Sequence, residues 1–314
     1  MAKTFKSLLG DDIVNTRTML HEAIPITGTI PSGTYTDYNI KTFSHGMFES
    51  VYDYPYLSSS ANHIFDITFG YSSAASASAN TQNAKKLNIY NQMAQVLMGY
   101  DSGSNIRKFD SDGLLDDNGA GTMDYCYFLN FSRLLTKDEV KKNTFRLAYY
   151  HSGTLDVGGA AGWKKAHKTL GDYNSANEFR TSPAGDYGLI FTASSTTGYP
   201  GNSSVGLVFY QAGIVVLTSS IFGGSTHQST NNTTPATTIG KVMVAPGATA
   251  AGASLGSSIT TAQTGSTIET LSKSFRKRLI DIDFNNTIEL NSAIYFCRIN
   301  HNEFNYSSNP TYVS

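Results

Sequence analysis

Charged residues are scarce in this chain of 314 residues. Asp, Glu, Lys and Arg make up 15% of the sequence, against about 25% in an ordinary soluble protein. The net charge is −1, so the basic surface that neutralises many phosphates is missing, which argues against bulk nucleic-acid binding. No apolar run approaches the roughly 20 residues that cross a bilayer, and we predict no membrane span. Residues 1–14 lack the apolar centre of a secretory signal, so we expect no export by that route.

Cysteine is also rare, with only Cys126 and Cys297. Each lies in an aromatic, strand-like run, where cysteine packs as a small hydrophobic residue. A protein made inside a cell stays reduced, so we predict two buried free thiols and no disulfide. The seven histidines show no His-x-x-x-His spacing, and no Cys-x-x-Cys pair or phosphate-cradling glycine loop occurs. We predict no metal site and no cofactor.

An acidic loop is the nearest approach to a metal motif. Calcium prefers six to eight oxygen ligands on flexible loops. The calcium-loop pattern breaks here, because position 114 is Leu and no Glu closes the run at Gly121. We favour a solvated acidic turn over a calcium site. The oxygen-bearing residues are Asp110, Asp112, Asp116, Asp117 and Asn118.

Aromatic and hydroxyl side chains are abundant instead. The chain has 19 Tyr, 17 Phe, 28 Gly and about 70 Ser and Thr, and 40% of its residues are hydrophobic, which is too many for a disordered chain. Tyr and Phe are enriched in interface cores, whereas charged residues are depleted there. Two interpretations follow: an ordinary β protein with a large core, or a protein that buries much of its surface against neighbours.

Strand patterns outnumber helix patterns. Residues His63 to Tyr71 alternate with period 2, and Val205–Tyr210 with Ile214–Ser219 predict a β-hairpin around Gly213. The apolar residues of one segment recur instead at helical spacing, which predicts a helix over about 81–99 with Thr81 as its N-cap. Capping boxes at residues 136–139 and 266–269 predict two short helices.

These elements predict a mainly β fold, with α+β as an alternative. The architecture we expect is a β-sandwich or two packed antiparallel sheets, decorated by the one longer helix and by short helices. The expected organisation has four parts. These are an N-terminal arm or clasp (1–62), a β-rich core with the helix 81–99 and a loop excursion at 153–177 (63–222), low-complexity loops (223–265), and C-terminal strands that complete the core (266–314).

Two segments carry a resemblance to a known class of proteins. They are HGMFESVYDYPYLSSSANH at residues 45–63 and AIYFCRINHNEFNYSSNPTY at residues 293–312. Both resemble stretches of virion structural proteins of marine contractile-tailed bacteriophages, in particular the tail and baseplate class. The resemblance covers about a quarter of the chain, and residues 153–265 resemble nothing in that class.

This resemblance implies a non-enzymatic subunit in a symmetric virion assembly, made in the host bacterial cytoplasm. Its partners would be copies of itself and other virion proteins. It also implies further sequence after residue 314. We expect the arm and the C-terminal strand to contact adjacent subunits through aromatic residues, with these interface candidates: Tyr52, Tyr54, Tyr56, Phe304, Tyr306 and Tyr312.

Three alternatives stay open. The first is a capsid or neck structural protein. The second is a receptor- or carbohydrate-binding virion module, which would use the loops at 223–238 and 245–264, with Trp163, Tyr173 and Tyr199 as stacking candidates. The third is a hydrolase with Ser254 as nucleophile, because Gly252-Ala253-Ser254-Leu255-Gly256 matches a nucleophile-elbow pattern. No clear strand or helix flanks this match, so we disfavour the third.

Overall fold

Strand β6 (Tyr125–Phe131) shows how the sequence builds this fold, because both of its faces are buried. Tyr127, Leu129 and Phe131 point to one hydrophobic cluster, and the alternate residues Cys126 and Phe128 point to a second. Successive side chains of a strand lie on opposite faces. A strand without a polar face must therefore be covered by a layer on each side.

A computed structural model describes residues 7–22, 29–30, 37–74, 79–113, 121–152, 166–192, 204–222, 265–276 and 278–297. The chain forms two compact units, one made of residues up to Leu20 and from Ile288 onward, and the other of residues 21–287. This division differs from the sequence-based boundary of the arm at residue 62.

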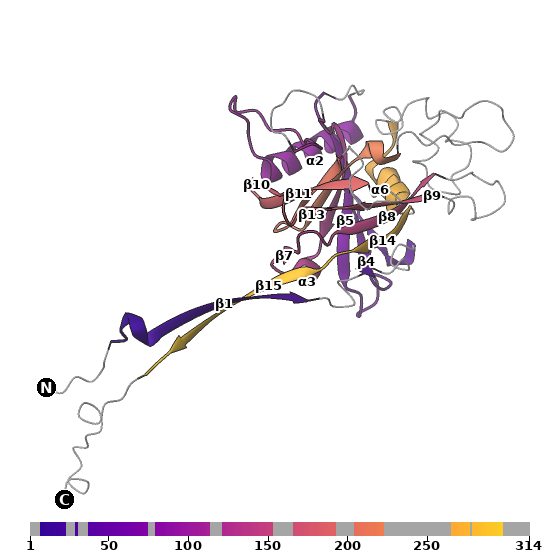
Figure 1. Cartoon of the computed structure of the whole chain (residues 1–314). Coiled ribbons are helices and arrows are strands. Elements are labelled where there is room, and N and C mark those ends of the chain that lie inside the picture. Colours follow the sequence, from indigo (N-terminus) through magenta and orange to yellow (C-terminus); the bar gives the residue numbers. More distant parts are fainter. Residues whose placement is uncertain are drawn as a thin grey trace, which may run out of the picture. The chain divides into compact units, whose positions relative to one another are not determined.

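One long antiparallel sheet forms the frame of the larger unit (Figure 1). In spatial order its strands are β2 (Thr29–Ile30), β14 (Leu279–Asp283), β8 (Arg146–Ser152), β9 (Ala166–Gly171), β11 (Gly185–Thr192), β12 (Ser204–Phe209), β13 (Ile214–Thr218), β6, β5 (His63–Tyr71), β4 (Glu49–Tyr52) and β3 (Ile40–Thr42), with β10 (Arg180–Ser182) paired to β11.

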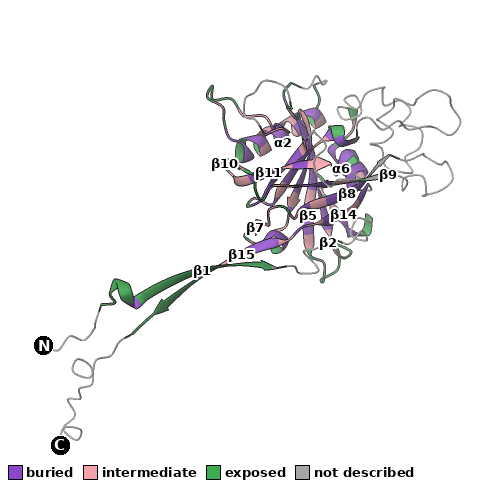
Figure 2. Ribbon diagram, in the orientation of Figure 1, coloured by how far each residue is buried: buried purple, intermediate pink, exposed green. Residues whose placement is uncertain are grey.

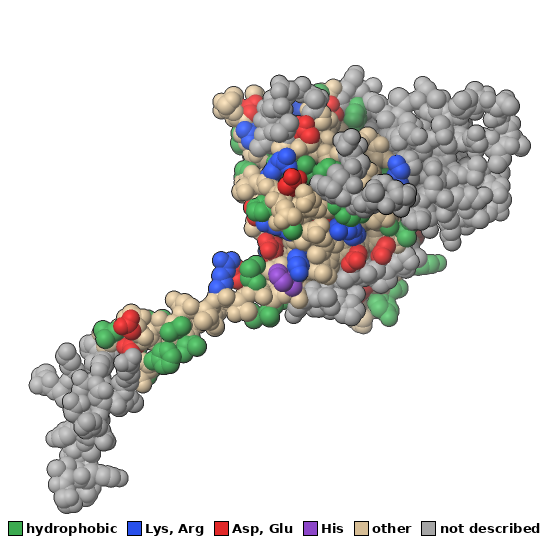
Figure 3. Space-filling model, viewed as in Figure 1, with side chains coloured by type: hydrophobic (Ala, Val, Ile, Leu, Met, Phe, Trp, Pro, Cys, Tyr) green, Lys and Arg blue, Asp and Glu red, His purple; other side chains and the backbone are tan. Residues whose placement is uncertain are grey.

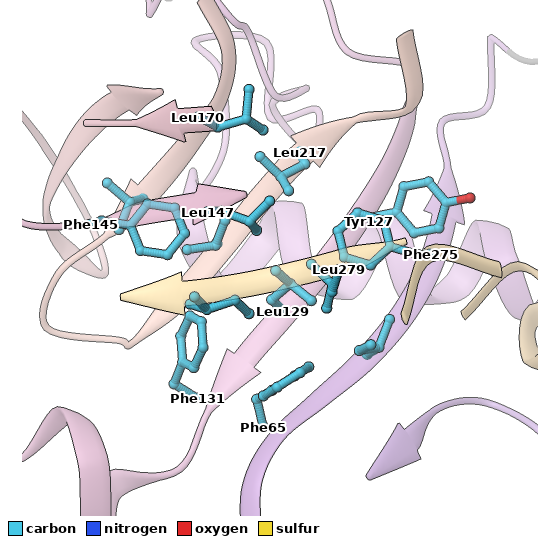
Figure 4. Close-up of a cluster of buried hydrophobic side chains, with 14 of the residues drawn as sticks. Phe65, Tyr127, Leu129, Phe131, Phe145, Leu147, Leu170, Leu217, Phe275 and Leu279 are labelled. Atoms are coloured by element: carbon cyan, nitrogen blue, oxygen red, sulfur yellow. The ribbon is translucent and has the colours of Figure 1, made fainter. Parts of the chain in front are cut away.

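The two halves of this sheet pack against each other. Phe131 of β6 contacts Phe284, which follows β14, at 4.9 Å between ring centroids, and Phe145, which precedes β8, at 6.3 Å. These residues come from strands that are far apart in the sheet order, so the sheet folds over its own inner face. The result is a β-sandwich-like core filled by aromatic and leucine side chains (Figure 4).

Helix α2 (Thr81–Leu97) covers the opposite face of β5 and β6. Tyr90, Ala94 and Leu97 are buried in the second hydrophobic cluster, beside Phe128. The helix lies very close to the sheet at Gly70, where an added Cβ would be 2.8 Å from the backbone oxygen of Lys86. Only a residue without a side chain permits this approach.

Helix α6 (Ile268–Arg276) packs on β5 and β4 and brings a buried charge with it. Arg276 is 2% exposed, and its Nε donates to Glu49 at 3.3 Å while its Nη2 donates to Asp37 at 2.9 Å. Burial raises the pKa of Glu49, and the neighbouring Arg276 guanidinium opposes that shift. Because a buried charge needs a partner, this ion pair positions the helix on the sheet.

The remaining elements of the larger unit are short. They are two 3-10 turns, η3 (Asp37–Asn39) and η5 (Ser219–Phe222), the helix α3 (Arg133–Thr136) and the strand β7 (Glu139–Val140), which pairs with Asn286 and Thr287 at the beginning of β15 (Asn286–Tyr295). The smaller unit holds η1 (Gly10–Asp12) and most of β1 (Ile13–Glu22) and β15, which pair with each other.

The predicted fold class is confirmed: the chain is mainly β and sandwich-like, with one longer helix and shorter ones. The strand at 63–71 and the hairpin around Gly213 are also confirmed. Three local predictions are wrong. The N-cap of α2 is Asn80, whose side chain accepts from the Asn83 amide. The helix predicted to begin at Thr136 ends there. Both thiols are free, but Cys297 is exposed and only Cys126 is buried.

Candidate interaction surface

The smaller unit is a two-stranded ribbon of β1 and β15. The Phe296 amide donates to the carbonyl of Asp12 at 2.8 Å, and the hydroxyl groups of Thr16 and Ser292 are 2.6 Å apart. Both contacts fit one antiparallel register, in which Asp12 lies opposite Phe296 and Thr16 lies opposite Ser292. The first and last described strands therefore run side by side (Figure 1).

This register separates the ribbon side chains into two faces, because alternate residues of a strand point to opposite sides. One face holds six large apolar residues and, between them, the hydroxyl groups of Thr16, Thr18 and Ser292. We call it the apolar face. Ile288 is half-buried, and the other five are between 42% and 50% exposed: Val14, Leu20, Leu290, Ile294 and Phe296.

The other face of the ribbon is mixed. Arg17 forms an ion pair with Glu289 there, between the exposed side chains of Ile13, Met19 and Tyr295. The ribbon is thus amphipathic, with its charged pair on one side only. Figure 3 shows hydrophobic side chains along this unit, and Figure 2 shows that nearly all of its described residues are exposed.

A ribbon of this kind is not a stable structure by itself. An isolated pair of strands is marginally stable at best in water, and three or more strands or a covering layer are needed. Contiguous exposed apolar surface rimmed by polar groups marks interaction sites in soluble proteins. The apolar face therefore has the character of a surface that becomes covered in an assembly.

A second exposed surface lies at the β3 edge of the large sheet. Tyr54 is 60% exposed and Tyr38 is 81% exposed, and their segments are joined by a hydrogen bond from the Tyr56 amide to the Tyr38 carbonyl at 3.3 Å. Of the predicted interface residues, Tyr54 and Tyr56 belong to this surface. Tyr52 is half-buried and packs edge-on against His63.

The other predicted aromatic contacts divide into two groups. Tyr173 is described, and the Arg146 guanidinium lies 4.2 Å from the centroid of its ring, so one face of that ring is already occupied. The following residues lie outside the described part of the chain: Trp163, Tyr199, Phe304, Tyr306 and Tyr312.

One group of side chains resembles a catalytic triad in composition. The Asp66 carboxylate accepts from the Ser50 hydroxyl at 2.5 Å and contacts the His63 imidazole at 2.8 Å. In a Ser-His-Asp triad the imidazole lies between the hydroxyl and the carboxylate. Here the carboxylate lies in the middle and Ser50 is 4% exposed, so the hydroxyl is neither activated by the imidazole nor open to a substrate.

A second polar group surrounds Asp172, which is fully buried. Its carboxylate accepts from the Tyr210 hydroxyl at 3.0 Å, from the Ser175 hydroxyl at 2.8 Å, from the Asn143 amide at 2.8 Å and from Arg146 at 3.0 Å. Burial raises the pKa of Asp172, and these donors oppose that shift. The arrangement joins β8 to the β12–β13 hairpin and is a structural network.

The predicted acidic turn is only partly described. Asp110 is buried, and its carboxylate accepts from the Asp112 amide at 3.1 Å, whereas residues 114–120 lie outside the described part. Among the described residues, no group of three or more His, Cys, Asp or Glu side chains is placed to hold a metal ion. Ser254 also lies outside them. None of the described helices combines the length and apolar character of a membrane span.

Comparisons with known proteins add no further identification: no protein-family model, no curated protein and no solved structure matches this chain.

Sequence reasoning placed an interface in the N-terminal arm and the C-terminal strand, but it missed the residues of the apolar face. The sequence does contain a signal for this face. From Ile288 to Phe296 the even positions carry Ile, Leu, Ser, Ile and Phe, a period-2 pattern with one uncharged side. What the pattern lacked was the identity of the strand beside it.

Proposed function

We propose that this chain is a non-enzymatic structural subunit of a bacteriophage virion, in the tail or baseplate, that acts through contacts between subunits. One observation carries the proposal: a two-stranded ribbon built from both described ends of the chain presents an apolar face with no layer of described residues over it. A subunit of an assembly is expected to have such a surface. The resemblance of residues 45–63 and 293–312 to virion proteins supports the same assignment.

The composition agrees with this proposal. Charged residues are depleted in interface cores, and aromatic residues are enriched there. The exposed tyrosines near Tyr54 would provide a second contact, on a different unit of the same chain. Two separate contact surfaces on one subunit allow it to bind more than one neighbour, as a ring or layer of a virion requires.

The first test is the oligomeric state of the purified full chain, measured by light scattering. We expect multimers, and we expect the double variant Leu290→Thr, Ile294→Thr to form smaller species at the same concentration. Threonine keeps the strand propensity but removes the apolar surface. The matched control is Val96→Thr with Leu134→Thr, two exposed apolar residues of the larger unit, which should leave the multimer intact.

The second test is the protein composition of purified virions of the phage that encodes the chain. Mass spectrometry should detect the chain in many copies per particle. A chain that is monomeric at all concentrations and missing from the particles would contradict the proposed function.

A further inference from the structure

The open edge of β1 is the feature of the ribbon that the proposed function leaves unexplained. In the part of the chain that the structure describes, β1 is the terminal strand of the sheet β1–β15–β7. Natural proteins protect such edges with proline, lysine, bulges or covering loops, because the unpaired backbone groups otherwise bind another strand. Residues 13–20 read IVNTRTML and contain neither proline nor lysine.

The only charge in this segment is already neutralised. Arg17 pairs with Glu289 of the neighbouring strand in the same ribbon. A short segment with strong strand propensity, low net charge and no proline is the pattern that favours pairing between chains. The edge is therefore suited to receive a strand.

The hydrogen bonds of the ribbon determine which residues face the open edge. In antiparallel pairs, alternate residues exchange hydrogen bonds with the partner strand. Because the Phe296 amide donates to the carbonyl of Asp12, the even-numbered residues of β1 direct their peptide groups toward β15. The odd-numbered residues from Ile13 to Met19 then direct theirs toward the open edge.

We infer that this edge pairs with the same edge of a second copy, antiparallel and about a two-fold axis at Thr16, so that two ribbons form one four-stranded sheet. The inference rests on the proposed function and names its partner. In this register Asn15 lies opposite Arg17 of the second copy, and Ile13 lies opposite its Met19. A two-fold axis at Arg17 would instead place the two Arg17 side chains directly opposite each other. Like charges directly opposed in a sheet are destabilising, so the axis at Thr16 is favoured.

Two further features favour this register of the pairing. A shift by one residue would place the apolar face of one ribbon beside the mixed face of the other, because side chains alternate between the faces. In the register centred on Thr16, the apolar faces of both ribbons lie on the same side and form one continuous surface. The pairing also uses only residues 13–19, which belong to the ribbon unit. A two-fold axis at Thr18 would also pair His21 and Glu22, which belong to the larger unit.

Disulfide trapping tests the register directly. Thr16 would lie opposite its own copy in a non-hydrogen-bonded pair, with Cα atoms about 4.5 Å apart, within the range that a disulfide spans. Thr18 is on the same strand and the same face, but the Thr18 residues of the two copies would be about 13 Å apart. Thr18→Cys is therefore the matched control for Thr16→Cys.

Both variants are made in the full chain with Cys297→Ser, because Cys297 is exposed and Cys126 is buried. Under mild oxidation we expect roughly tenfold more disulfide-linked dimer from Thr16→Cys than from Thr18→Cys, since only the first pair is within bridging distance. Equal or greater trapping by Thr18→Cys would overturn the register and therefore the inference.

The same experiment separates the inference from the proposed function. If light scattering finds multimers but neither variant is trapped, the assembly uses other surfaces: the inference is overturned and the proposed function stands. If the chain is monomeric and neither variant is trapped, both are contradicted. Circular dichroism of each variant confirms that its fold is unchanged.

Discussion

Strand β6 and the ribbon part of β15 are both rich in apolar residues with strand propensity, yet their surroundings are opposite. In β6, Tyr127 and Phe128 are fully buried on opposite faces, one in the sandwich core and the other beneath α2. In β15, Ile294 and Tyr295 are at least half exposed on opposite faces. Apolar composition alone therefore does not determine burial. What matters is whether the chain itself supplies a layer for each face.

The comparison also separates two uses of aromatic residues. In the larger unit they stabilise the fold, as in the contact of Tyr90 with Phe109 at 5.4 Å between ring centroids. In the ribbon, an exposed Phe296 adds little to folding and remains available to a partner. Substitutions in the two regions should therefore affect different measurements.

The largest difference is expected for truncation of an aromatic residue in the core. Phe128→Ala should lower the free energy of unfolding by about 3–5 kcal/mol, because it leaves a cavity between α2 and the sheet. Ile294→Ala in the ribbon should change it by less than about 0.5 kcal/mol in dilute solution. Urea unfolding measures both. Similar losses for the two variants would show that the ribbon is part of the folding core.

The next effect is the pH dependence of stability caused by Lys86, a buried residue of α2. This side chain is fully buried and its ammonium donates to the Ser266 carbonyl at 2.6 Å. Burial lowers the pKa of Lys86 to about 8, from 10.5 for an ordinary lysine. Between these values the unfolded chain binds more protons than the folded chain, so the free energy of unfolding rises with pH.

This rise in the free energy of unfolding should amount to at most about 3 kcal/mol. The variant Lys86→Met lacks this titrating group. The difference in unfolding free energy between the natural chain and Lys86→Met should therefore change between pH 8 and 10.5 and stay constant below pH 7. Urea unfolding across this range measures the difference. Parallel curves for the two proteins would contradict the assignment.

A smaller effect is expected at Gly70, where the sheet meets α2. An added methyl group would be 2.8 Å from the Lys86 carbonyl oxygen and 2.9 Å from the Tyr90 amide nitrogen, and backbone atoms have little freedom to move. Gly70→Ala should therefore cost about 1–3 kcal/mol.

The control for this substitution lies in the other unit. A Cβ at Gly10 meets nothing within 4 Å, so Gly10→Ala should change the free energy of unfolding by less than about 0.5 kcal/mol. Thermal or urea unfolding compares the two variants. Equal effects would mean that the close packing at Gly70 adjusts without cost.

Local patterns predicted the elements whose signal lies within one segment. The alternation in residues 63–71 predicted β5, and Gly213 between two apolar runs predicted the hairpin of β12 and β13. Caps were less predictable, because several polar residues near a helix end offer the same hydrogen bond. Asn80 caps α2 in place of Thr81, and Ser132 caps the helix that ends at Thr136.

The class of the fold follows from the amino-acid sequence alone, because strand periodicity and a low content of charge are local or additive properties. The neighbours of each strand, in contrast, are set by the folded chain as a whole. The pairing of β1 with β15 joins residues such as Thr16 and Ser292, which are far apart in the chain, and no local pattern encodes such a contact. The ribbon, its apolar face and its open edge all follow from that one long-range pairing.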